Sequence, residues 1–227
     1  MNQISLNVLA ISIFVLTFSV LLEPVLPYPP ALPAAVTFGI LVLATADTLA
    51  WESQGATLLL DWFERQSPEQ QKRVARHEAG HFLVAYLLGI PIAGYALNAW
   101  EAFKQGQKAQ GGVRFEDAEL LSQLQKGKLG YDLLDKYCTV WMAGIAAETL
   151  AYGNAEGGAE DRAKLQAVLK AIKNSAMEDA NTKARFHSLQ ARTLIESHQD
   201  AYEALVAALE KRSPVAECYQ LLEEKIS

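Results

Sequence analysis

Residues 73–89, RVARHEAGHFLVAYLLG, contain the most informative pattern in this chain. Apolar residues recur along this stretch at helical spacing, and Gly89 followed by Pro91 ends the pattern. At the other end, Ser67 and Pro68 supply a serine cap and a proline at the first helical position. The sequence therefore predicts one helix that starts near residue 67 and ends near residue 89.

Two histidines and a glutamate lie in the middle of this helix with the spacing H-E-x-x-H. An α-helix turns about 100° and rises about 1.5 Å per residue, so His77 and His81 lie about 40° apart in azimuth and about 6 Å apart along one face. Both imidazoles can therefore bind one metal ion. Glu78 lies beside them, where its carboxylate can act as a general base on a metal-activated water. The pattern is typical of zinc metallopeptidases, and such a site requires a third protein ligand.

Two carboxylates are candidates for that third ligand. Asp161 follows the turn-rich stretch 152–160 and falls in the first turn of a predicted helix. A carboxylate at such a position often only complements the helix dipole. Glu148 lies on the preceding predicted helix and is an equally open candidate from the residues alone.

The second part of the chain, residues 66–227, is predicted to form a mainly helical domain with a small β-hairpin. The two strands are expected on either side of the polar loop KQGQKAQ. Their edge could hold an extended peptide by backbone pairing, or it could only brace the helix that carries the histidines. The strands are predicted at about 92–100 and 111–115, and the later helices at about 131–152, 159–177, 181–211 and 214–225.

The first 64 residues contain none of the 20 Lys and Arg residues of the chain. Residues 4–22 form an uncharged apolar run long enough to cross a bilayer core about 30 Å thick, and a proline-rich break separates this run from a second one. A cleaved signal peptide would need a basic segment at its start, which is missing. Residues 1–64 are therefore expected to form a membrane anchor with one or two transmembrane helices, at about 4–22 and 34–50.

Basic residues begin at Arg65, just beyond the last apolar run. By the positive-inside tendency, the globular domain is expected on the cytoplasmic or stromal side of a plasma or thylakoid membrane. The two cysteines, Cys138 and Cys218, fit a reducing compartment. A net charge of −6 and the lack of a basic stripe argue against nucleic acid as a partner.

Three separated segments resemble the peptidase domain of the FtsH-type membrane-bound zinc metalloproteases. VARHEAGHFLVAYLLG (residues 74–89) resembles the helix of that family that carries the two histidines and the catalytic glutamate. MAGIAAETLAYG (residues 142–153) resembles its G-G-R-A-A-E-E-x-x-F-G stretch, and GGAEDRAKLQ (residues 157–166) resembles its G-A-x-N-D stretch. The three segments occur in the order in which the family has them.

The resemblance implies a zinc site and assigns its residues. Carried over position by position, His77, His81 and Asp161 would bind Zn²⁺, Glu78 would be the catalytic base, and Glu148 would be the partner of a ligand histidine. FtsH-type proteins assemble as hexamers, so the resemblance adds a homo-oligomer or an association with FtsH-type proteases to the expected partners. The other expected partners are polypeptide substrates and the membrane.

The chain departs from that family in ways that bear on function. It has no G-x-x-x-x-G-K-[ST] phosphate loop, so no ATP site is expected. Glu160 stands where the family has asparagine, and the loop between the strands differs. Without a motor, we expect an ATP-independent endopeptidase that cleaves unfolded or flexible proteins. The alternative is a non-catalytic, zinc-binding membrane partner or regulator of a full-length FtsH-type protease or of another membrane complex.

Overall fold

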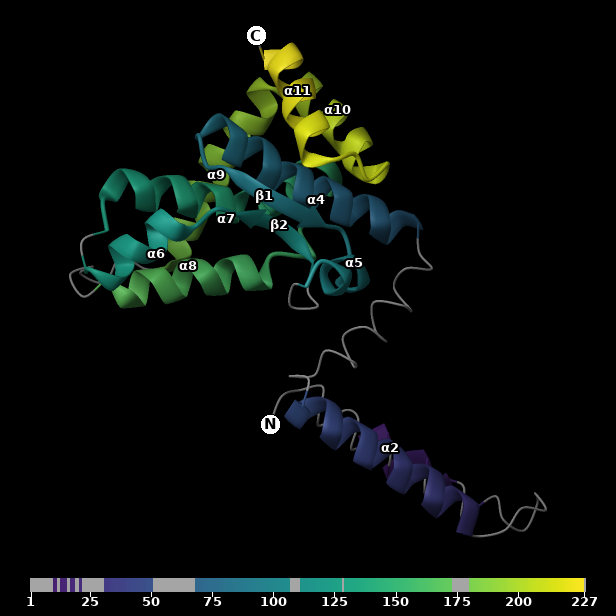
Figure 1. Cartoon of the computed structure of the whole chain (residues 1–227). Coiled ribbons are helices and arrows are strands. Elements are labelled where there is room, and N and C mark those ends of the chain that lie inside the picture. The colour runs from purple at the N-terminus through teal and green to yellow at the C-terminus, as the bar shows by residue number, and fades with distance from the viewer. Residues whose placement is uncertain are drawn as a thin grey trace. The chain divides into compact units, whose positions relative to one another are not determined.

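The computed structural model of the chain divides into two compact units, Met1–Leu60 and Asp61–Ser227. Figure 1 shows both units along the chain. The structure describes residues 10–11, 13–15, 17–18, 21, 31–50, 68–106, 111–127, 129–172 and 180–226.

In the first unit, the helix α2 (Ala31–Ala50) contains the apolar run expected at 34–50. The span expected at 4–22 lies largely outside the described residues, and those of its residues that are described are helical. Within the described part of the chain, no helix is both long enough and apolar enough to cross a membrane.

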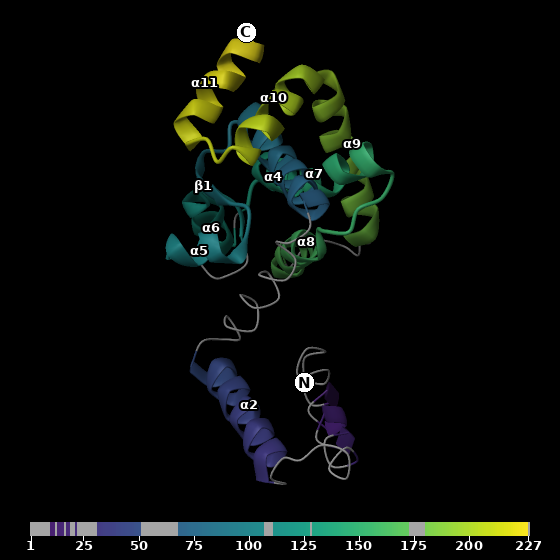
Figure 2. The same ribbon diagram turned by 90° about the vertical axis from the view of Figure 1, so that its right-hand side faces the viewer.

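The second unit is mainly helical with one two-stranded sheet, as the sequence predicts. Figure 2 shows α4 and α7 in the middle of this unit, with α9 on one side and the hairpin on the other. The elements are α4 (Pro68–Leu87), β1 (Ile92–Ala96), α5 (Ala99–Lys104), β2 (Gly112–Phe115), α6 (Ala118–Gln125), α7 (Tyr131–Tyr152), α8 (Ala159–Ala171), α9 (Ala180–Ser197), α10 (Gln199–Glu210) and α11 (Val215–Ile226).

The helices α4 and α7 approach each other so closely that only glycine fits at one point of contact. A Cβ atom added at Gly80 would lie 2.7 Å from both the Ala143 carbonyl oxygen and the Ala147 Cβ atom. The middle of each helix is buried, from His77 to Ala85 in α4 and from Tyr137 to Glu148 in α7. The H-E-x-x-H turn therefore lies against α7 in the interior and not on a solvent-exposed face.

The strand β2 pairs with β1 along one edge, and its other edge faces away from β1. Tyr95 pairs with Val113, and the Glu116 N–H donates to the Pro91 carbonyl oxygen at 2.9 Å. In an antiparallel ladder, successive residues point their backbone groups alternately toward the partner strand and away from it. Val113 and Phe115 therefore present their N–H and C=O groups at the outer edge of β2, which lies beside α4.

The strand predicted at 92–100 is correct only as far as Ala96, because the short helix α5 follows it. The Asn98 side chain caps α5 by accepting the Glu101 N–H at 2.8 Å, and the Glu101 carboxylate accepts the Leu97 N–H at 2.8 Å. Asn-x-x-Glu is a capping pattern, so this helix has a sequence signal that a strand prediction misses. The sequence prediction also lacks α6, which is only 8 residues long.

The helix predicted at 181–211 is in fact two helices, α9 and α10, which meet at His198. The backbone of His198 leaves the helical conformation, with φ −128° and ψ 39°. Its Nδ1–H donates to the Leu194 carbonyl oxygen at 2.9 Å and so satisfies a carbonyl at the end of α9. The helix predicted at 159–177 ends as α8 at Ala171, and residues 173–179 lie outside the described residues.

Candidate metal centre

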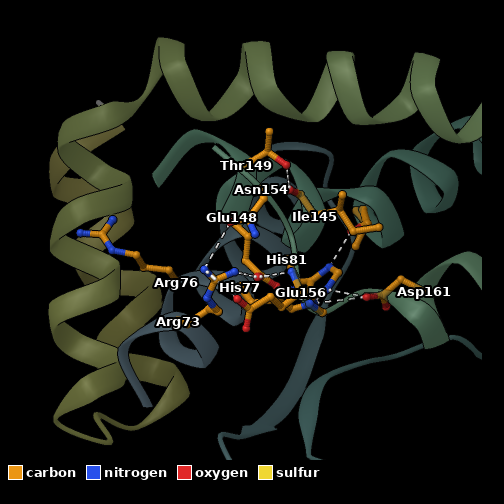
Figure 3. Close-up of polar contacts among 12 residues, drawn as sticks. Arg73, Arg76, His77, His81, Ile145, Glu148, Thr149, Asn154, Glu156 and Asp161 are labelled. Carbon is orange, nitrogen blue, oxygen red and sulfur yellow. Dashed lines mark hydrogen bonds and ion pairs between the residues drawn. The ribbon is translucent and has the colours of Figure 1, made fainter. Parts of the chain in front are cut away.

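Three side chains from two helices converge inside the second unit, as Figure 3 shows. His77 and His81 come from successive turns of α4, and Asp161 comes from the first turn of α8. The His77 Nε2 atom lies 3.0 Å from the His81 Nε2 atom and 3.3 Å from the Asp161 Oδ2 atom. The His81 Nε2 atom lies 3.4 Å from the Asp161 Oδ2 atom. A tetrahedral metal with bonds of about 2.0–2.1 Å has edges of about 3.3 Å between its ligands. The three atoms therefore have the spacing of three corners of a tetrahedral metal site.

A hydrogen bond on the far side of each imidazole fixes its tautomer. The Nδ1 atom of His77 lies 2.7 Å from a Glu148 carboxylate oxygen, and the Nδ1 atom of His81 lies 2.7 Å from the Val140 carbonyl oxygen. Both partners only accept, so each Nδ1 carries the hydrogen and donates it. In the neutral rings, the Nε2 lone pairs then point at each other and at the Asp161 carboxylate. Such an arrangement is repulsive unless a cation lies between the donors.

Burial and charge together make this cluster a place for a cation. Burial lowers the pKa of His77, but hydrogen bonds to Asp161 and Glu148 outweigh burial and raise this pKa to about 10. Burial opposes the ionisation of Asp161, yet His81 and His77 hold its pKa well below the usual range. Burial likewise opposes the ionisation of Glu148, yet hydrogen bonds from His77, the Glu156 N–H and the Arg73 guanidinium lower its pKa to about 2. A proton on His77 thus takes the position between the donors that a metal ion would occupy.

We expect the binding of a divalent metal ion to release about one proton at neutral pH. In the metal-free protein, His77 is protonated below its pKa of about 10, and a metal ion takes the Nε2 lone pair that holds this proton. Because protons compete with the metal, the metal affinity should rise about tenfold per pH unit as the pH increases toward that pKa. Isothermal titration calorimetry in two buffers of different ionisation enthalpy counts the released protons. A count of zero at neutral pH would contradict the expected protonation of His77.

Glu148, the partner of His77, is almost completely buried, with 1% of its surface exposed. Besides the hydrogen bond from the His77 N–H, its carboxylate accepts three more hydrogen bonds. The Arg73 Nη1 atom lies 2.9 Å from Oε2, the Glu156 N–H donates to Oε2 at 2.9 Å, and the Gly157 N–H donates to Oε1 at 3.1 Å. These bonds hold Glu148 as a carboxylate that faces His77. Glu148 is not one of the three candidate metal ligands, His77, His81 and Asp161, which are called the three-donor group below.

Glu78 lies next to the three donors and also outside their group. Its Oε2 atom accepts the Val113 N–H from the outer edge of β2 at 2.8 Å. Two hollows, of about 240 and 280 Å³, are each lined by His77 and Glu78, and the larger one is also lined by His81 and Asp161. The carboxylate of Glu78 and the three donors therefore border one cleft, and a ligand in this cleft can contact both.

Two glycines leave room for these side chains. A Cβ atom added at Gly144 in α7 would lie 2.3 Å from the His77 Nε2 atom, which is closer than real Cβ atoms approach other atoms. A Cβ atom added at Gly157 would lie 2.6 Å from the Glu148 Oε1 atom. The imidazole of His77 and the carboxylate of Glu148 therefore occupy space that any other residue at these positions would fill.

The structure places all five residues that the sequence interpretation singles out at one site. His77, His81 and Asp161 converge, Glu148 contacts His77, and Glu78 borders the same cleft. No family model matches this chain, and no curated protein matches it.

Three further groups at the site are absent from the sequence interpretation, namely the Arg73 guanidinium, the Val140 carbonyl and Gly144. Arg73 lies four residues before His77, so helical spacing places both on one face, but the sequence interpretation gives Arg73 no role. The Val140 carbonyl has no sequence signal, because every residue has a carbonyl. Gly144 lies in a run of small residues, which indicates close helix packing but not what packs there.

Proposed function

We propose that this chain is a membrane-anchored, zinc-dependent endopeptidase that needs no ATP and cleaves unfolded or flexible polypeptides. The observation that carries the proposal is the convergence of His77, His81 and Asp161 beside the Glu78 carboxylate in one cleft. Two imidazoles and one carboxylate suit Zn²⁺, whereas Mg²⁺ and Ca²⁺ prefer oxygen ligands. Three protein ligands leave a coordination position open, as in catalytic zinc sites. The resemblance of three segments to the FtsH-type peptidase domain supports the same activity.

The residues around the metal position would have different roles in peptide hydrolysis. When bound, zinc supplies a Lewis acid that polarises a peptide carbonyl and acidifies a water molecule. The Glu78 carboxylate takes a proton from the attacking water and returns it to the leaving amine. The Val113 N–H donates to this carboxylate and holds it at the edge of the cleft. Glu148 holds His77 in the tautomer that leaves its Nε2 atom free for the metal.

The outer edge of β2 supports the choice of a polypeptide substrate. The Val113 C=O and the Phe115 N–H and C=O lie at this edge, beside the Val113 N–H that donates to Glu78, and both residues line the cleft together with Asp161. An extended chain can pair with a strand edge through main-chain hydrogen bonds. Only unfolded or flexible segments can lie extended in this way, which fits a sequence without an ATP-binding phosphate loop.

The first unit is proposed to attach the chain to a membrane. Among its described residues, large apolar side chains are exposed, including Ile11, Phe14, Leu21, Val36, Phe38 and Leu43. Exposed apolar surface of this kind is usually covered by lipid or by another protein. The positive-inside tendency would then place the metal centre on the cytoplasmic or stromal side. Alkaline carbonate washing of membranes from producing cells tests the anchor, because release of the chain into the supernatant would contradict it.

The activity is tested by degradation of an unfolded casein-type substrate by the purified full-length chain, with zinc and without ATP. The natural chain is compared with Glu78→Gln, and the zinc content of both is measured. Cleavage by the natural chain alone supports the endopeptidase. A zinc-loaded natural chain that leaves every unfolded substrate intact would overturn it and favour the alternative, a non-catalytic zinc-binding partner or regulator of an FtsH-type protease or other membrane complex.

A further inference from the structure

Arg73 lies one helical turn before His77 and connects several parts of the metal centre, as Figure 3 shows. Its Nη1 atom lies 2.9 Å from the Glu148 Oε2 atom. Its Nη2 atom lies 3.3 Å from the Glu156 Oε1 atom and 3.4 Å from the Asn154 Oδ1 atom. One guanidinium therefore binds both α7 and the loop that leads from α7 to α8.

The guanidinium of Arg73 is largely buried and also contacts an aromatic ring. Its central carbon lies 4.3 Å from the centre of the Tyr152 ring, so a cation–π contact adds to the ion pairs. Only 14% of the Arg73 side chain and 2% of the Glu148 side chain are exposed. Exposed ion pairs contribute little to stability or orientation, but this pair is shielded from water and its planar donor has several partners.

Glu148 connects Arg73 with the candidate metal ligands. The same carboxylate accepts the His77 N–H at 2.7 Å and the backbone N–H groups of Glu156 and Gly157 at 2.9 and 3.1 Å. The chain continues from Gly157 directly into the first turn of α8, which carries Asp161. One carboxylate therefore connects a histidine of α4 with the loop that delivers the third donor.

We infer that Arg73 is a positioning residue that sets the metal affinity of the centre. It fixes Glu148, and through Glu148 it orients the His77 ring and the loop before Asp161. The inference rests on the proposed metal site, and it adds a residue to which neither the H-E-x-x-H spacing nor the three resembling segments gives a role. Arg73 donates no electron pair to the metal, so its effect is on geometry.

Arg73→Met tests the inference, because methionine keeps much of the aliphatic length and none of the donors. We expect the zinc dissociation constant, measured by competition with a chromophoric chelator, to rise about 10- to 100-fold, which is the range for partners of metal ligands. Arg73→Lys, which keeps the charge but not the planar fork, should recover part of the affinity. The matched control is Arg76→Met. Arg76 lies on the same helix and pairs with Glu203 at 2.8 and 3.0 Å, away from the donors, so its loss should leave zinc affinity near that of the natural chain.

A second measurement separates positioning from a general structural role. The visible absorption of the Co²⁺-loaded protein reports the coordination geometry, and we expect it to change in Arg73→Met but not in Arg76→Met. Zinc binding by Arg73→Met as tight as that of the natural chain would overturn the inference. If Arg73→Met does not fold, Arg73→Lys decides in its place: weaker zinc binding than that of the natural chain supports the inference, and equal binding overturns it.

The proposed activity and this inference can fail separately, because zinc affinity is measured without a peptidase assay. A chain that binds zinc tightly and cleaves nothing would refute the endopeptidase and leave the role of Arg73 standing. A natural chain that binds no zinc would overturn both.

Discussion

Glu78→Gln is expected to lower kcat for an unfolded peptide substrate by about 100- to 10,000-fold, the range for loss of a general acid–base group. The zinc content should stay that of the natural chain, because Glu78 lies outside the three-donor group. The glutamine amide oxygen can still accept the Val113 N–H, so the side chain should keep its position at the edge of the cleft. What the amide cannot do is take a proton from water and return it to the leaving amine.

Cleavage of a fluorogenic unfolded peptide and zinc analysis of both proteins measure this effect. The matched control is Glu160→Gln, because Glu160 lines the same cleft but is exposed and is not one of the three candidate metal ligands. This control should keep most of the activity. Equal rates for the natural chain and Glu78→Gln would show that Glu78 is not the base.

Gly144→Ala is expected to weaken zinc binding by more than about 100-fold, the upper end of the effect of changing a ligand's partner. The added Cβ atom would lie 2.3 Å from the His77 Nε2 atom, whereas ordinary contacts are 3.4–4 Å. The imidazole would therefore have to leave the position where it meets His81 and Asp161. Helix propensity alone would predict a benefit of this substitution, because a change from glycine to alanine inside a helix usually increases the stability of the fold by about 0.5–1 kcal/mol.

Chelator competition with Zn²⁺ measures the loss of affinity, and circular dichroism checks that Gly144→Ala keeps its helices. Gly39→Ala is the matched control, because Gly39 also lies in a helix and a Cβ atom there would meet nothing within 4 Å. Zinc affinity should be unchanged in this control. If Gly144→Ala binds zinc as tightly as the natural chain, His77 does not bind the metal from the position described.

Local patterns account for the elements that the sequence predicts well. The helix α7 begins at Tyr131 and ends at Tyr152, as predicted, because Gly153 takes a left-handed conformation with φ 77° and stops the helix. Errors arise where two local signals compete. Residues 97–100 continue an apolar run that favours a strand, but Asn98 and Glu101 form a cap, and the cap prevails. At His198, a side-chain hydrogen bond to the preceding turn ends a helix that the residue pattern alone would continue.

Helical spacing is a local property, so the residue pattern was enough to place His77 and His81 on successive turns of one helix with Glu78 beside them. It left Asp161 and Glu148 as two open candidates, and only the family resemblance separated their roles. Their contacts with His77 join residues 84 and 71 positions apart, which no local periodicity specifies. The tertiary structure decided these contacts, together with the roles of Arg73 and Gly144, because they depend on how closely α4 packs against α7 and on where the loop before α8 returns the chain.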